Sequence, residues 1–129
     1  MSLYFKNERD KDFFNTCEEI RRSNKKYIST PDIARKAVHS NAKSFYITCY
    51  RCYNMIRKIK SGEKIYLRSK AKSELFEEIK TRYMNISIEN PKMKDFDIAC
   101  MITSGKAPRF YITETRAERL YYNLLKTMQ

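Results

Sequence analysis

The chain has 129 residues, the size of one ordinary domain, and hydrophobic residues make up 42% of it, which is enough to build a core. Two glycines and three prolines are too few for a β-sandwich or a β-barrel, because those folds need frequent turns. A formal net charge of +12 favours a polyanionic partner such as nucleic acid, and the alternative is a charged surface without a partner.

The ends and the apolar segments of the chain bear on its location. The N-terminal region has no apolar run of the length that a signal peptide needs. No segment approaches the ~20 apolar residues of a membrane span. We therefore expect a cytoplasmic protein that does not associate with a membrane. In that compartment the four cysteines are expected to be reduced thiols.

Two helices are expected in the first third of the chain. Apolar side chains recur at helical spacing from Phe13 to Ile20 and predict a helix over about residues 8–23. Thr30 suits an N-cap and Pro31 suits a first helical position, so a second, shorter helix is expected to begin there.

A third helix is expected over about residues 49–60. Thr48 is a suitable N-cap for this helix, and Gly62 lies just beyond its end, where glycine is favoured because it accepts a left-handed conformation. The segment 45–47, which reads Phe-Tyr-Ile, is expected to be extended and to form at most a short strand, with Phe and Ile in the core and Tyr facing outward.

The second half of the chain has the same order of elements. Helices are expected over about residues 70–84, 95–103 and 114–127, from the spacing of their apolar side chains. Residues 64–68 and 85–88 alternate apolar and polar side chains, which makes them two further candidates for short strands.

The order of elements repeats because the sequence repeats. Residues 32–56 and 97–121 align without a gap and share nine of 25 positions, where unrelated segments would share about one or two. Upstream, Glu18-Glu19-Ile20 echoes Glu77-Glu78-Ile79 at a different offset. We therefore expect a mainly α fold in which two tandem three-helix copies pack into one pseudo-symmetric domain. The copies span about residues 8–60 and 70–127, and the domain spans residues 1–129.

Basic residues on the third helix of each copy indicate nucleic-acid binding. Arg51, Asn54 and Lys58 share one helix face, which suits contacts to phosphates and base edges. In the second copy, Arg116 and Arg119 occupy the positions of Arg51 and Asn54, and Arg109 flanks the aromatic segment. The candidate nucleic-acid-binding residues are Arg51, Asn54, Lys58, Arg109, Arg116 and Arg119.

These features favour a nucleic-acid-binding protein, such as a helix-turn-helix-like regulator or an accessory protein of a mobile element. About seven residues separate the second and third helices, whereas a helix-turn-helix uses a turn of three or four. Aromatic side chains among cations can also stack single-stranded bases, although a repeated Phe-x-Ile more often packs a core. The alternative function is a protein-interaction or assembly module, which can include a homo-oligomer, with Tyr121, Tyr122 and Leu125 as its contact face.

The sequence contains no recognisable catalytic or cofactor motif, so we expect neither enzymatic activity nor a bound cofactor. Cys49 and Cys52 have the spacing of half a zinc site, with Cys17, Cys100 and His39 as the remaining candidate ligands. The competing interpretation is that Cys17, Cys52 and Cys100 are small buried hydrophobes. His39 is not accompanied by a marked nucleophile or paired acid.

Overall fold

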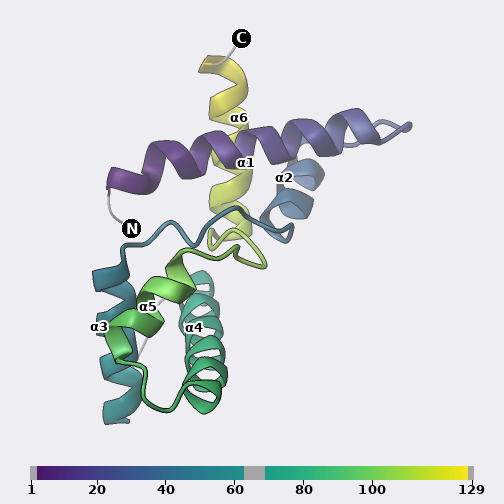
Figure 1. Ribbon diagram of the computed structural model, residues 1–129. Helices are drawn as coiled ribbons and strands as arrows, with labels where there is room; N and C mark the ends of the chain where they lie inside the picture. Colours follow the sequence, from purple (N-terminus) through teal and green to yellow (C-terminus); the bar gives the residue numbers. More distant parts are fainter. Residues whose placement is uncertain (1–2, 63–68, 128–129) are drawn as a thin grey trace.

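The computed structural model describes residues 3–62 and 69–127, and this part of the chain consists of helices and loops without a β-strand (Figure 1). The mainly α prediction is therefore confirmed, and the strand candidate at residues 64–68 lies outside the described residues. In the same part of the chain, no helix is both long and apolar enough to cross a membrane. The helices are α1 (Leu3–Ser23), α2 (Thr30–Val38), α3 (Cys49–Ser61), α4 (Lys70–Glu89), α5 (Asp95–Thr103) and α6 (Glu114–Thr127).

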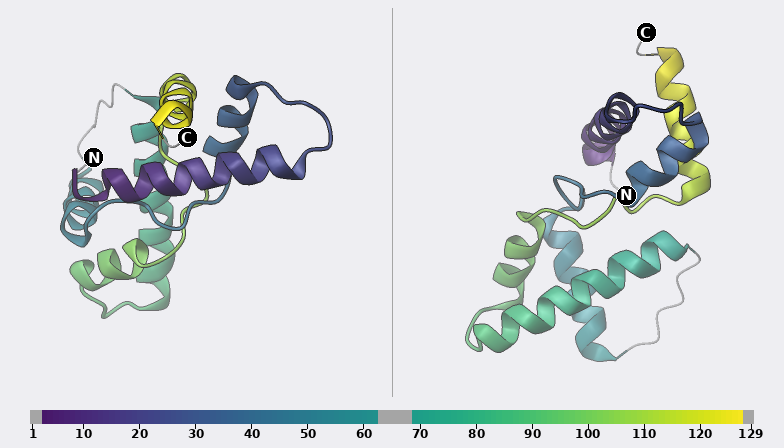
Figure 2. Two further views of the ribbon diagram at one scale, coloured as in Figure 1. Left: turned by 90° about the horizontal axis from the view of Figure 1, so that it is seen from above. Right: turned by 90° about the vertical axis from the view of Figure 1, so that its right-hand side faces the viewer.

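The helices form two groups that do not follow chain order. Helices α1, α2 and α6 pack against one another in the upper group of Figure 1, and helices α3, α4 and α5 pack against one another in the lower group. The right-hand view of Figure 2 separates the same two groups. Each third helix therefore packs on the first two helices of the other half of the chain. Since α2 and α3 do not pack together, these consecutive helices do not form a helix-turn-helix.

Two loops, residues 39–48 and 104–113, carry the chain between the groups and meet where they cross. The N–H of Ala42 donates to the carbonyl of Ala107 at 2.9 Å, and the N–H of Ala107 donates back to Ala42 at 3.0 Å. This isolated antiparallel bridge is the only β-pairing among the described residues, so the short strands expected at the Phe-Tyr-Ile segments are not formed. Ala42 and Ala107 are matched positions of the sequence alignment.

The first Phe-Tyr-Ile segment is kinked instead of being extended. Tyr46 adopts a left-handed conformation with φ 57°, which interrupts the side-to-side alternation of a strand. Its neighbours Phe45 and Ile47 and its own side chain are all buried. The prediction that this tyrosine faces outward is therefore wrong, and its hydroxyl donates to Asp12 Oδ2 of α1 at 2.6 Å.

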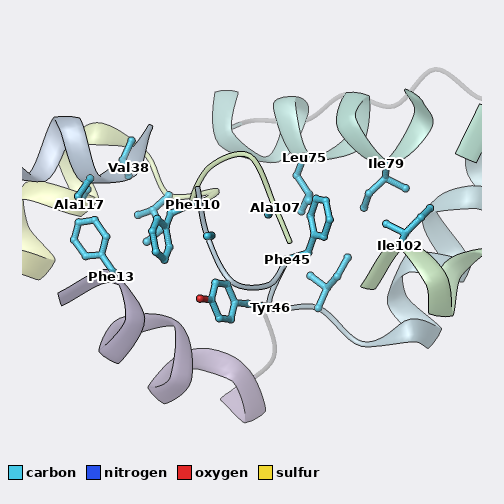
Figure 3. Close-up of a cluster of buried hydrophobic side chains, with 14 of the residues drawn as sticks. Phe13, Val38, Phe45, Tyr46, Leu75, Ile79, Ile102, Ala107, Phe110 and Ala117 are labelled. Atoms are coloured by element: carbon cyan, nitrogen blue, oxygen red, sulfur yellow. The ribbon is translucent and has the colours of Figure 1, made fainter. Parts of the chain in front are cut away.

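One continuous apolar core passes through the crossing and into both groups (Figure 3). On the side of the upper group, Phe13 packs edge-on against Phe110 at 5.5 Å between ring centroids, and Phe110 stacks on Tyr46 at 6.1 Å. On the side of the lower group, Ile79 of α4 and Ile102 of α5 are buried. The loops therefore do more than connect the groups, because their side chains join the two halves of the core.

Helix boundaries follow local capping. The N-cap of α2 is Ser29, whose Oγ accepts the N–H of Asp32 at 3.3 Å, so the prediction of Thr30 as the cap is wrong by one residue. Helix α1 begins at Leu3, earlier than expected. Helix α4 continues to Glu89, and the strand expected at residues 85–88 is helical.

The echo between the two Glu-Glu-Ile triplets does not extend to their burial. Glu18 is buried, whereas Glu77 is exposed, and Ile20 is half-buried, whereas Ile79 is fully buried. Glu18 is therefore part of the packed interior, where its carboxylate accepts the hydroxyl of Tyr121 at 3.0 Å.

Candidate nucleic-acid interface

Helix α3 is defined by a cap at each end. The hydroxyl of Thr48 accepts the N–H of Arg51 at 3.0 Å, and Gly62 ends the helix in a left-handed conformation with φ 70°. Both predicted capping roles are confirmed. The cap at Thr48 also fixes where the first basic side chain of the helix projects, because Arg51 is in the first turn.

The two faces of α3 have different roles. Cys52 and Ile56 are fully buried and pack this helix in the lower group. Arg51 and Asn54 are half-buried and Lys58 is exposed on the other face, as their spacing predicts. The candidate binding face of α3 is therefore partly covered at Arg51 and Asn54 and exposed at Lys58.

A cavity of about 280 Å³, here called the junction cavity, lies where the crossing loops meet α3, α4 and the start of α6. Its charged lining is entirely basic among the described residues and comprises Arg9, Arg51, Lys72 and Arg116. Its floor comes from the crossing loops and includes Phe45, Ile47 and Ile112, which are buried in the core. The cavity brings together Arg51 and Arg116, matched positions of the two sequence copies that are 65 residues apart.

Three of these cations share a local geometry. In each case the side chain of a Ser or Thr N-cap accepts the backbone N–H of a basic residue three positions later. A capping box has Glu or Gln at that position, so a cation there is a departure from the usual pattern. The three cap and cation pairs are Thr48 with Arg51, Ser69 with Lys72, and Thr113 with Arg116. Three helix N-termini therefore border one cavity, and their dipoles add to its positive potential.

The side chains of Arg51, Lys72 and Arg116 form no ion pair or hydrogen bond with any residue in the described ranges 3–62 and 69–127. Some basic residues elsewhere are paired, as Arg35 is with Glu118 at 2.8 Å and Lys60 is with Asp95 at 2.9 Å. Others, such as the exposed Arg119, are also without an ion pair among the described residues, so it is the shared cavity that distinguishes these three cations. Mutual repulsion among neighbouring cations is unfavourable, and an anion bound between them would offset it.

The junction cavity continues along α3 as a shallow groove, here called the α3 groove. Its first part, of about 290 Å³, shares Arg51 and Lys72 with the cavity and also contains Asn54 and Lys58. Its outer part, of about 420 Å³, is lined by Asn54, Lys58, Arg57 and Ser61. Within the described residues, neither part is lined by an acidic side chain.

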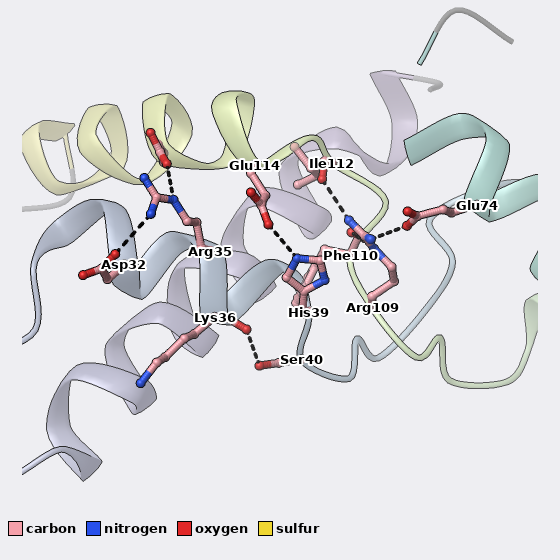
Figure 4. Close-up of polar contacts among 11 residues, drawn as sticks. Asp32, Arg35, Lys36, His39, Ser40, Glu74, Arg109, Phe110, Ile112 and Glu114 are labelled. Carbon is pink, nitrogen blue, oxygen red and sulfur yellow. Dashed lines mark hydrogen bonds and ion pairs between the residues drawn. The ribbon is translucent and has the colours of Figure 1, made fainter. Parts of the chain in front are cut away.

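A hollow of mixed charge adjoins the junction cavity. It has a volume of about 190 Å³, contains Glu74 and Glu114 together with Lys70 and Arg109, and shares Ala71 and Thr113 with the cavity. Glu114 accepts a hydrogen bond from His39 Nε2 at 2.9 Å, and this bond lowers the pKa of the Glu114 carboxyl group (Figure 4). This hollow therefore has charged residues of both signs, whereas the charged lining of the α3 groove is basic among the described residues.

The two remaining sequence candidates lie outside the junction cavity and the α3 groove. Arg109 pairs with Glu74 and also donates to the carbonyls of Phe110 and Ile112, at 3.1 and 3.3 Å (Figure 4). Its guanidinium group thus ties the second crossing loop to α4. Arg119 is exposed on α6 and lines neither feature.

A larger hollow of about 620 Å³ lies along α1 but carries mixed charge. Its charged lining residues are Asp12, Glu18, Glu19, Arg21, Arg22 and Lys43. A polyanion meets repulsion there as well as attraction, so size alone does not make it the better candidate.

Three thiols meet where α3 packs on α5. Cys49 Sγ lies 3.1 Å from the hydroxyl of Thr103, and a hydrogen bond with Cys49 raises the pKa of Cys100. Burial raises the pKa of Cys52 to about 12. No set of three or more His, Cys, Asp or Glu residues in the described part of the chain is arranged to hold a metal ion. His39 is not one of this group, because it lies in the hollow that contains Glu114.

Sequence reasoning missed Lys72 and Arg9 as members of the site. The signal for Lys72 is its position three residues after Ser69, the same spacing that places Arg51 after Thr48 and Arg116 after Thr113. Arg9 lies on a helix whose packing next to the cavity is a tertiary feature, so no local pattern indicates it.

The chain matches no protein-family model, no curated protein and no solved structure. Functional inference for this protein therefore depends on its own residues and their geometry.

Proposed function

We propose that the protein binds nucleic acid, with the phosphate backbone in the junction cavity and along the α3 groove. The observation that carries this proposal is the convergence of Arg51, Lys72 and Arg116 on one cavity without an ion pair among the described residues. Phosphate oxygens would satisfy these cationic donors and offset their mutual repulsion. The net charge of +12 would add a long-range attraction that speeds the encounter.

The length of the basic surface supports a polymeric ligand. Arg51 and Lys58 are seven residues apart on α3, which corresponds to roughly 10 Å along the helix axis. Successive nucleotides of a stacked strand advance by about 3.4 Å along the helix axis, and the path between their phosphates is longer, so this distance covers about two phosphates. A small anion would need only the cavity, whereas the α3 groove gives a strand further cationic contacts.

We also propose that the two halves of the chain are copies of one three-helix unit that have exchanged their third helices about an approximate two-fold axis. The support is the reciprocal pairing of Ala42 with Ala107, which are matched positions in the sequence. Helices α2 and α5 have nine residues each, and each packs on the third helix of the other half. In this arrangement Arg51 and Arg116 are equivalent residues placed on either side of the axis.

The proposal is for a binding protein and gives no catalytic role to His39. The Nε2 of His39 is engaged by Glu114, and the cysteine group lies on another pair of helices. The exposed aromatic residue of α6, Tyr122, is engaged by Lys126 at 4.3 Å from its ring centroid and is not part of the proposed surface.

The test is binding of labelled single-stranded DNA, single-stranded RNA and duplex DNA, measured by fluorescence anisotropy across ~50 to 300 mM salt. Four or five phosphate contacts to a single strand predict a slope of about −3 in a plot of log affinity against log salt. Arg57→Ala and Lys58→Ala should each reduce that slope by about 0.7, because each removes one contact in the α3 groove.

Arg119→Ala is the matched control, since Arg119 is an exposed arginine outside the groove and the cavity. It should leave both affinity and slope unchanged. Failure of all three nucleic acids to bind at the lowest salt would refute the proposal and direct attention to a protein partner. An Arg119→Ala loss as large as that of Lys58→Ala would instead place the interface elsewhere.

A further inference from the structure

We propose that the junction cavity is a phosphomonoester site that takes the terminal phosphate of a nucleic-acid strand, with the rest of the strand lying in the α3 groove. This inference rests on the proposed nucleic-acid function and specifies which part of the ligand enters the cavity. Three features of the cavity lead to it: its charge, its boundaries and its size.

The charge of the cavity matches a terminal phosphate better than an internal one. Arg51, Lys72 and Arg116 line it without an ion pair among the described residues. A terminal phosphate carries about −1.5 to −2 charges at neutral pH and three strong acceptor oxygens, whereas an internal phosphodiester carries one charge. A more highly charged group gains more from three converging cations and offsets more of their mutual repulsion.

The boundaries of the cavity leave a strand one favourable direction. The floor is closed by Phe45, Ile47 and Ile112, which belong to the core. The adjoining hollow has mixed charge, with Glu74 and Glu114 beside Lys70 and Arg109, so it attracts phosphodiesters less than the α3 groove does (Figure 4).

The side of the cavity that faces α1 also has mixed charge, because Arg9 lines the cavity there and Asp12 and Glu8 lie close to it. Asp12 accepts the hydroxyl of Tyr46, a lining residue, and the charges of Asp12 and Glu8 act on that tyrosine. Toward α3, by contrast, Arg51 and Lys72 line both the cavity and the groove. A strand that is bound through an internal phosphate must both enter and leave the cavity. A strand that is bound through its terminal phosphate needs only the path toward α3.

The size of the cavity fits a phosphate with part of its sugar. Its volume of about 280 Å³ is just below the range of about 300–1,000 Å³ that is usual for small-molecule sites. The bases that follow would lie outside it, along the face that carries Asn54 and Lys58. The site is therefore expected to recognise the strand end without reading its sequence.

The test uses three single-stranded oligonucleotides of one sequence, with a 5′ phosphate, with a 3′ phosphate, or with hydroxyl groups at both ends, and each has an internal fluorophore. We expect one of the two phosphorylated strands to bind at least ~10-fold more tightly than the hydroxyl strand, and the pair identifies the end that enters the cavity. Arg116→Ala should abolish this gain, whereas Arg119→Ala, a change three residues further along α6, should retain it. Arg51→Ala provides a second variant, and far-UV circular dichroism checks that all variants are folded.

The outcomes separate the two proposals. Equal affinity for all three oligonucleotides would overturn the terminal-phosphate inference while leaving nucleic-acid binding intact. The inference would also fail if Arg116→Ala still bound a phosphorylated oligonucleotide more tightly than the hydroxyl strand. If no oligonucleotide binds, the proposed function fails, and inorganic phosphate then tests the cavity alone. A phosphomonoester site is supported if phosphate raises the thermal stability of the wild type and of Arg119→Ala but not of Arg116→Ala. If phosphate does not stabilise the wild type, the proposed site fails as well.

Discussion

Removing the hydroxyl group of Tyr121 tests how α6 is placed. This hydroxyl donates to Glu18 Oε1 at 3.0 Å, and the two residues are 103 positions apart in the chain. Tyr121 is 0% exposed and Glu18 is 7% exposed, so water does not readily replace the bond. Since Glu18 belongs to α1 and Tyr121 to α6, the bond exists only if the last helix packs on the first one.

The expected cost of Tyr121→Phe follows from the type of bond that is lost. A hydrogen bond to a charged acceptor contributes about 1.5–3 kcal/mol to the free energy of unfolding. Glu18 also pairs with Arg21, so the carboxylate retains a partner and the cost should lie at the lower end of that range. The substitution keeps the ring and its packing against Phe14, whose centroid lies 6.0 Å away, and therefore creates no large cavity.

A double-mutant cycle with Glu18→Gln isolates the interaction, with unfolding in urea followed by far-UV circular dichroism. We expect a coupling energy of about 1 kcal/mol between Tyr121→Phe and Glu18→Gln, because groups in direct contact do not behave additively. Tyr122→Phe is the control on the same helix and should change stability by less than about 0.5 kcal/mol, since Tyr122 is 55% exposed. Additive effects at Tyr121 and Glu18 would mean that α6 does not pack on α1, and the reasoning about the crossed arrangement would fail.

Two further predictions concern the isolated first half and the response to alkali. The fragment 1–62 lacks α6, which covers the buried face of α2. We therefore expect the fragment to be either unfolded or oligomeric. A monomer in sedimentation that unfolds cooperatively in urea would contradict this expectation. Burial raises the pKa of Tyr111 and Tyr121 from 10.0 to about 12, and that of Cys17 from 9.0 to about 12. The native state thus holds these protons more tightly than the unfolded state, and the stability they contribute is complete below about pH 9 and is lost as the pH rises toward 12. Urea midpoints measured from pH 8 to 12 should fall over that interval, and a constant midpoint would refute the assignment.

Elements with a local signal could be predicted from the sequence. The helices at residues 95–103 and 114–127 have the expected bounds, because apolar spacing defines both within a few residues and the hydroxyl of Thr113 caps the second. The failure at residues 85–88 has a physical reason. A four-residue alternation also fits a helix, and Ile86 continues the apolar stripe of Ile79 and Tyr83 at helical spacing, so packing decides in favour of α4.

The choice of helix partners could not be predicted in the same way. The loop 39–48 has ten residues and can span up to about 33 Å, which allows α3 to reach either group of helices. The hydrophobic patterns of α3 and α6 would allow either helix to cover the apolar face of α2. Local patterns therefore specify the helices, whereas the pairing depends on side-chain fit at contacts such as Tyr121 with Glu18.

The pairing of the helices also determines which basic residues line the junction cavity. Sequence spacing groups Arg51 with Asn54 and Lys58 on one helix, and the structure adds Lys72 from α4 and Arg116 from α6. If each third helix packed on its own half of the chain, the loops would not need to cross, and nothing would require the first turns of α3 and α6 to face the same cavity. The crossing places Arg51 and Arg116 together at the cost of their repulsion, and a bound phosphate would remove that cost. The crossing that joins the two halves of the core thus also brings Arg51, Lys72 and Arg116 to one cavity whose charged lining is entirely basic among the described residues.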